Sequence, residues 1–88
     1  MKDEENAQKL NDAEFTDLKN KANAKLKSAV SNDPQNALDP LVSRYRVIEA
    51  IDVYQEALHL KLNTPKQKAS IHKNLNIAYT EQEKLEEE

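Results

Sequence analysis

The feature that most limits the fold of this chain is that none of its 88 residues is glycine. A β-rich fold of this size needs tight hairpin turns and bulges, where glycine adopts positive φ angles at no steric cost. Helix interiors, in contrast, are destabilised by glycine. The sequence is also rich in alanine, leucine, lysine, glutamine and glutamate, which lose little conformational freedom in a helix. An all-α fold is therefore predicted.

The remaining composition limits the chemistry and the location that we expect. The chain has no cysteine, so disulfides, thiol catalysis and cysteine-based zinc sites are not expected, and a cytoplasmic location is predicted. Charged residues make up 33% of the chain, and no apolar run approaches the roughly 20 residues that span a bilayer, so membrane insertion is not expected. The net charge of -3 disfavours a general nucleic-acid-binding surface.

Three prolines divide the chain, and each follows a residue that can cap a helix: Asp33-Pro34, Asp39-Pro40 and Thr64-Pro65. Proline suits the first helical position, and a preceding Asp or Thr side chain can accept hydrogen bonds from the next free amides. Helices are therefore predicted to begin near Pro40 and Pro65. Residues 32–39 are predicted to form a loop, because Ser, Asn, Asp and Pro cluster there.

The apolar spacing predicts three helices joined by short connections, which favours an antiparallel helical bundle. The first helix is expected to begin between Leu10 and Thr16 and to end near Ser31, after a disordered or frayed N-terminus at 1–11. The second is expected over residues 40–62, and the third over 65–84 or beyond. The helical domain is accordingly placed at 12–86.

Each predicted helix carries apolar residues at spacings of three and four. The expected core positions of the first helix are Phe15, Leu18, Ala22, Leu26, Ala29 and Val30. The second helix has two neighbouring stripes, one of Leu41, Tyr45, Ile48, Ile51, Leu58 and Leu62, and one of Val47, Ala50, Tyr54 and Ala57. The third presents Ile71, Leu75, Ala78 and Leu85, with Tyr79 at the edge. Two stripes imply that the second helix contacts a helix on each side.

Two segments resemble the tetratricopeptide repeat (TPR) family. Residues 49–58, EAIDVYQEAL, resemble the second helix of a repeat, in which an alanine, an aromatic residue and an Ala-Leu pair recur at helical spacing. Residues 68–82 look like the first helix of a following repeat, and the match is carried by Asn74, Leu75, Ala78 and Tyr79. The resemblance implies a TPR-like helix-turn-helix array of about three helices, with an insertion at about 32–46.

Residues 18–26 are similar to the opening helix of the repeat domains of chaperone-associated (co-chaperone) proteins. In that family a lysine and an asparagine four residues later face the groove, and these are Lys19 and Asn23 here, while a further groove asparagine falls at Asn74. The resemblance implies that they bind the carboxylate of a heat-shock chaperone tail, which lysine and asparagine donors suit. Weaker candidates are Lys73 and Lys27. The chain departs from the family at two close helix crossings, where a glycine is usual and Ala22 and Asn76 stand instead.

The predicted function is a protein–protein interaction module that binds a peptide or helix of a partner protein, with an acidic C-terminal tail as the ligand that the resemblance implies. No enzyme, metal or cofactor is expected, because His59 and His72 lie on different predicted helices and no glycine-rich phosphate loop exists. Arg44 and Arg46 flank Tyr45, but the assignment of Tyr45 to a core stripe disfavours nucleic-acid binding.

Two alternative functions stay open at this point. One is a structural capping or self-assembly fragment of a larger helical solenoid, which would associate through the free side of the third helix. The other is a microtubule-interacting-and-trafficking type of three-helix bundle, which the chain length favours and which takes up a partner helix in a groove.

Overall fold

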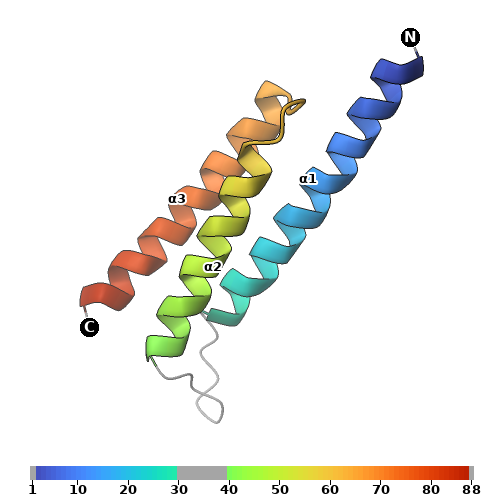
Figure 1. Ribbon diagram of the computed structural model, residues 1–88. Coiled ribbons are helices and arrows are strands. Elements are labelled where there is room, and N and C mark those ends of the chain that lie inside the picture. The colour runs from blue at the N-terminus through green and yellow to red at the C-terminus, as the bar shows by residue number, and fades with distance from the viewer. Residues whose placement is uncertain (1, 30–39, 88) are drawn as a thin grey trace.

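The computed structural model of the chain is an array of three α-helices (Figure 1). It describes residues 2–29 and 40–87, which contain no β-strand. Helix α1 spans Lys2–Ala29, α2 spans Pro40–Leu58 and α3 spans Pro65–Glu87. Helix α2 runs antiparallel to the other two, lies between them and packs against both (Figure 1). The predicted all-α fold with about three helices is confirmed.

Helix α1 begins earlier than the sequence predicted. We expected a start between residues 10 and 16 after a frayed N-terminus, whereas the helix begins at Lys2. Polar contacts that an argument from apolar spacing does not detect accompany the earlier start, and Gln8 Nε2 donates to the backbone oxygen of Leu62 at 3.0 Å. Asn11 is buried, its Nδ2 donates to Asn63 Oδ1 at 2.9 Å, and its Oδ1 accepts from the backbone N–H of Leu62 at 3.1 Å. These contacts hold the second and third turns of α1 against the connection that follows α2.

Helix α2 ends at Leu58, before the predicted end at Leu62. The side chain of Asn63 accounts for this end, because its Nδ2 donates to the backbone oxygens of Ala57 at 2.6 Å and of Leu58 at 3.2 Å. Carbonyl groups in the last turn of a helix have no partner within the helix. A left-handed glycine usually completes such an end. Here a side-chain amide does so, and no described residue has a positive φ angle.

Replacing Asn63 by alanine is expected to lower the free energy of unfolding by about 1–3 kcal/mol, because several buried polar groups lose their partner. Replacing Asn11 should cost a similar amount. Because the two amides share a hydrogen bond, the double variant should lose less than the sum of the single losses, by about 0.5 kcal/mol or more. Urea denaturation followed by circular dichroism measures the free energy of unfolding of the unmodified chain, the two single variants and the double variant. Strict additivity would show that the two amides act independently.

Helix α3 begins at Pro65 as predicted, and Thr64 caps it. The backbone N–H of Gln67 donates to Thr64 Oγ1 at 3.1 Å, and the Thr64 N–H donates to Gln67 Oε1 at 2.8 Å, which is a capping box. Gln67 Nε2 also donates to Asp12 Oδ1 at 2.9 Å, and Gln8 donates to the same oxygen. These two bonds lower the pKa of the Asp12 carboxyl. The cap of α3 is thereby tied to α1.

The hydrophobic core lies where α2 meets its two neighbours. Thirteen residues predicted for the core, from α1, α3 and the second stripe of α2, are buried or packed on the core as expected. The buried core comprises Phe15, Ala22, Ala29, Val47, Ala50, Ile51, Val53, Tyr54, Ala57, Ile71, Leu75 and Ala78. Partly buried side chains that pack on it include Leu18, Leu26, Leu58 and Leu85. Val30 lies outside the described residues, as does most of the predicted insertion.

Four residues predicted for the first stripe of α2 are not in the core. Leu62 lies beyond the helix end, and Leu41, Tyr45 and Ile48 are 70%, 65% and 44% exposed. We call the side of α2 that carries these last three residues the outer face of α2. Spacings of four and three place them in one line, and this line is turned away from both neighbouring helices. The second stripe, centred on Ala50, is the one that faces the core.

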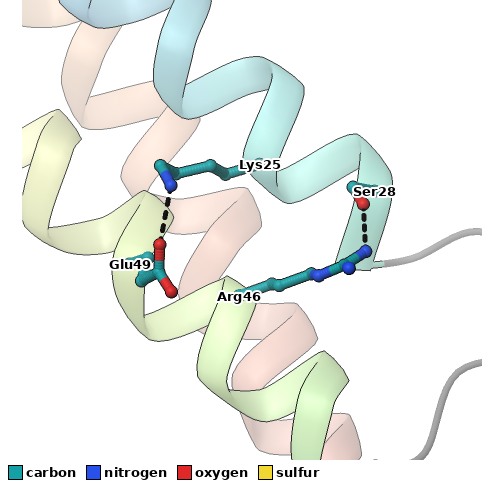
Figure 2. A network of polar contacts seen from close by, with 4 residues as sticks. All are labelled: Lys25, Ser28, Arg46 and Glu49. Atoms are coloured by element: carbon teal, nitrogen blue, oxygen red, sulfur yellow. Dashed lines mark hydrogen bonds and ion pairs between the residues drawn. The ribbon is translucent and has the colours of Figure 1, made fainter.

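Two polar pairs fix one side of the contact between α1 and α2, and Figure 2 shows both. Lys25 Nζ lies 2.6 Å from Glu49 Oε2, and Arg46 donates through Nη1 to Ser28 Oγ. The charged pair is about one third exposed, so its contribution to stability is small. Its main consequence is that Lys25 is directed toward α2 and neutralised there.

The two arginines near the start of α2 point to opposite sides, as predicted. Whereas Arg46 contacts α1, Arg44 donates through Nε and Nη2 to the backbone oxygen of Leu85 in α3, at 3.1 and 2.6 Å. A cation suits this place, because the last carbonyls of a helix carry partial negative charge. Tyr45 lies between them in the sequence. Its side chain was predicted to lie in the core but is exposed.

Candidate functional site

Three of the five residues predicted to bind a peptide, Lys19, Asn23 and Asn74, lie on the sides of α1 and α3 that adjoin one another. The two helices run parallel (Figure 1), and Lys19 of α1 donates through Nζ to Ser70 Oγ of α3 at 2.8 Å. Asn23 follows Lys19 by one turn, and Asn74 follows Ser70 by one turn, so each pair shares a helix side. We call these four residues the α1–α3 polar surface. Ser70 was not predicted as a member.

Lys19 has no carboxylate partner among the described residues. Its side chain is partly buried, and its hydrogen-bond partner is a neutral hydroxyl. Among the described residues the lysines that form ion pairs are Lys25 with Glu49 and Lys84 with Glu81. A partly desolvated charge without a counter-charge interacts more strongly with an approaching anion than a fully hydrated one does. Lys19 is therefore the residue of this surface best suited to bind a carboxylate.

Asn23 is exposed, and its Oδ1 accepts a hydrogen bond from the hydroxyl of Tyr54 in α2. Tyr54 is otherwise buried in the core, and burial raises the pKa of its hydroxyl, which keeps it a neutral donor. With Oδ1 occupied by Tyr54, the Nδ2 group of Asn23 is the part of the amide that can donate to a ligand. Sequence reasoning assigned Tyr54 to the core alone. A buried tyrosine hydroxyl needs a hydrogen-bond partner, and this need was the signal in the sequence that Tyr54 also contacts a polar residue.

The remaining predicted residues differ in their relation to this surface. Asn74 is partly buried, and Lys27 and Lys73 are exposed. Lys27 follows Asn23 by four residues, so it continues the row of Lys19 and Asn23 along α1 but is rotated by about 80° from Lys19 around the helix. Lys73 neighbours Asn74 in the sequence and is therefore rotated by about 100° from it around α3. The structure thus brings Lys19 of α1 to Ser70 of α3, with Asn23 and Asn74 one turn further along their helices, whereas no contact between described residues places Lys27 or Lys73 on this surface.

The lysine-rich stretch of α1 does not form one basic patch. Lys25 is paired with Glu49 on the side that packs on α2 (Figure 2). Lys21 is exposed and, two residues after Lys19, is turned to a different side of the helix. Among the lysines of this stretch, Lys19 is the one whose contact places its charge beside α3.

Other features of the described residues do not add a second site of known chemistry. Within this part of the chain, no group of three or more His, Cys, Asp or Glu side chains is placed to share a metal ion. An open depression on α3, lined by Asn76, Ile77, Thr80 and Glu81, does not include the α1–α3 polar surface. None of the helices in the described ranges is long and apolar enough to cross a membrane.

No family model, curated protein or solved structure matches this chain. The resemblance of residues 49–58 and 68–82 to tetratricopeptide repeats therefore stays a prediction. An order in which the middle helix packs on two parallel neighbours occurs in repeat arrays and in other three-helix arrangements. The interpretation of the α1–α3 polar surface depends on the chemistry of its own side chains.

Proposed function

We propose that the chain is a protein–protein interaction module that binds an acidic peptide segment of a partner protein along the α1–α3 polar surface. The observation that carries this proposal is the hydrogen bond from Lys19 to Ser70, which holds between two parallel helices an ammonium group that pairs with no carboxylate of residues 2–29 and 40–87. The tetratricopeptide resemblance supports it, because the same three residues, Lys19, Asn23 and Asn74, match the groove positions of that family. The role requires no catalytic group or cofactor, and a cytoplasmic location belongs to the same proposal.

A carboxylate that approaches this surface is a stronger hydrogen-bond acceptor for Lys19 than the Ser70 hydroxyl is. Replacing the hydroxyl by a carboxylate as the acceptor for Lys19 Nζ turns a hydrogen bond to a neutral group into a charge-assisted one. Ser70 is a small residue whose hydroxyl can rotate away at little cost. Lys19 is therefore held in place in the free protein but is able to exchange its partner when an anion arrives.

The spacing along α1 suits an extended peptide. Lys19, Asn23 and Lys27 follow one another at four-residue intervals, which corresponds to a rise of about 6 Å along the helix axis. In an extended peptide, alternate residues lie about 6.6 Å apart. A segment that lies parallel to α1 can thus present an acceptor to each of the three side chains. The acidic C-terminal tail of a heat-shock chaperone, which the resemblance implies, has this chemistry.

The test is an NMR titration of the labelled chain with a short acidic peptide that ends in a free carboxylate. We expect chemical-shift changes at Lys19, Asn23 and Asn74, and weaker binding at high salt because exposed charges are screened. Lys19→Ala is expected to weaken binding about tenfold or more, since a hydrogen bond to a charged group contributes about 1.5–3 kcal/mol. Lys21→Ala is the matched control, because it removes the same charge from another side of the same helix.

The outcomes separate the levels of the proposal. If an amidated peptide binds as well as the free acid, the surface recognises acidic side chains and not a chain terminus. If Lys21→Ala weakens binding as much as Lys19→Ala does, the attraction is general and the surface is not a site. If neither peptide shifts the three residues, the proposed function is wrong.

The structural alternatives receive different support. A microtubule-interacting-and-trafficking type bundle takes a partner helix into a groove, and apolar walls would suit such a ligand. The side chains between α1 and α3 are polar at Lys19 and Ser70, which favours a peptide with charged groups. A structural or self-assembly role is favoured by a separate observation, the exposed apolar residues on the outer face of α2.

A further inference from the structure

The outer face of α2 is a continuous row and not a set of scattered apolar residues. Leu41, Tyr45 and Ile48 follow one another at spacings of four and three, along about 10 Å of helix. Single exposed apolar side chains are normal on a protein surface, whereas a contiguous group often marks an interaction site. The row lies on α2, away from the α1–α3 polar surface, so it is independent of the proposed peptide site.

The same face becomes polar toward the end of α2. Asp52 follows Ile48 by one turn and is exposed. Gln55 comes next and donates through Nε2 to the hydroxyl of Tyr79 in α3, at 3.1 Å. Tyr79 is itself well exposed, so its ring extends this end of the face. From its start to its end, the outer face is therefore apolar, then acidic, then aromatic.

Helix α2 is basic in its first half and acidic in its second half. Arg46 and Glu49 are engaged with α1 (Figure 2), so the other charged residues of α2 are Arg44, Asp52 and Glu56, of which Arg44 and Asp52 each lie one turn from Ile48. Arg44 uses Nε and Nη2 on the backbone oxygen of Leu85, so its Nη1 group is still able to donate. Charges of opposite sign therefore lie one turn before and one turn after Ile48, the last residue of the apolar row.

We propose that the outer face of α2 binds the same face of a second copy of this chain, with the two α2 helices antiparallel about a two-fold axis near Ile48. Arg44 and Asp52 are each four residues from Ile48, so each Arg44 meets the Asp52 of the second copy. Leu41 and Gln55 are each seven residues from Ile48, on opposite sides of it. Leu41 of one copy therefore packs against Gln55 of the second copy and against the Tyr79 ring to which that Gln55 is hydrogen-bonded.

This face favours a second copy because it is complementary to itself in one orientation only. A parallel pairing places arginine against arginine and aspartate against aspartate, which is unfavourable. The antiparallel pairing satisfies both charges and covers the apolar row. Specific interfaces usually bury about 1,200–2,000 Å² in total, and a single helix face reaches only the low end of that range. The dimer is therefore expected to be weak, with a dissociation constant on the order of micromolar or above.

Analytical ultracentrifugation of the full chain, from low micromolar to near millimolar concentration, tests the proposal. The weight-average mass is expected to rise with concentration from that of the monomer toward twice that value. Ile48→Glu is expected to keep the chain monomeric throughout. The matched control is Ile77→Glu, because Ile48 and Ile77 are 44% and 48% exposed but Ile77 lies on α3. Circular dichroism and melting temperature establish that both variants are folded.

A charge exchange tests the orientation of the two copies. Asp52→Arg and Arg44→Glu are each expected to weaken self-association at least tenfold, and a mixture of the two variants should restore a heterodimer. Because Arg44 also contacts Leu85, loss of folding in that variant would be seen by circular dichroism, and the exposed Asp52→Arg then tests the charge pair alone.

Three results would overturn the proposal: a chain that stays monomeric near millimolar concentration, equal effects of Ile48→Glu and Ile77→Glu, or a dimer that Asp52→Arg does not weaken. Peptide binding along the α1–α3 polar surface is expected to be unchanged in Ile48→Glu. Failure of the dimer and failure of the peptide site are therefore distinguished by the same variant.

Discussion

Replacing Tyr54 by alanine is expected to lower the free energy of unfolding by about 3–5 kcal/mol, the largest loss among the changes considered for this chain. The side chain is 1% exposed and is among the largest that the core encloses completely. Its removal takes apolar contacts from α2 and leaves a cavity that the surrounding helices fill only in part. A single domain of this size has a total stability of only several kcal/mol, so much of the population should unfold. Urea denaturation followed by circular dichroism measures the loss.

Tyr54→Phe is the matched control for this change. It keeps the ring in the core and removes only the hydrogen bond to Asn23, so the expected loss is about 0.5–1.5 kcal/mol. The difference between the two variants is therefore the contribution of packing. If alanine and phenylalanine were equally tolerated, Tyr54 would not be a core residue and the placement of α2 between its neighbours would be wrong.

Ile71→Ala is expected to destabilise the fold by about 2–5 kcal/mol, because Ile71 on α3 has no exposed surface. The same change at Ile77, six residues later on the same helix and 48% exposed, should alter stability by no more than about 0.5 kcal/mol. Both substitutions raise intrinsic helix propensity by the same amount, so this term cancels when the two are compared. Thermal unfolding monitored by circular dichroism gives the two values side by side. Equal losses at both positions would contradict the burial of the Ile71 side of α3.

The parts of the fold that depend on local chemistry were predictable from the sequence. Pro40 and Pro65 mark helix starts because a proline in the first turn loses no hydrogen bond, and both helices begin there. The end of α2 was not predictable in the same way. It depends on Asn63, which lies five residues beyond Leu58 and turns back on the helix only in the folded connection.

The outer face of α2 shows a different limit of sequence reasoning. Helical periodicity predicts that Leu41, Tyr45 and Ile48 share one side, which is correct, but it does not say whether another element covers that side. Two apolar stripes were taken as two buried contacts. In the structure both neighbouring helices pack on the stripe centred on Ala50, whereas the other stripe is exposed at Leu41, Tyr45 and Ile48 and joins the core only at Ile51 and Leu58.

The candidate site was also predictable only in part. Lys19 and Asn23 were placed on one helix side from their spacing, and the structure retains this arrangement. Their partners Ser70 and Tyr54 come from two other helices, 51 and 31 residues away in the sequence. Such contacts depend on how the helices dock, and no local pattern near Lys19 or Asn23 encodes them.

The side-chain cap provided by Asn63 lets helix α2 end without glycine, and the absence of glycine affects the unfolded state. Because the amide completes the end of α2, the chain closes this connection without glycine. An average chain of 88 residues would contain about six glycines, and each exchange of glycine for alanine at a compatible site gains about 0.4–1 kcal/mol by restricting the unfolded chain. Together these restrictions amount to about 2–6 kcal/mol. A protein with a thin core thus gains part of its stability from the conformations that its unfolded chain does not visit.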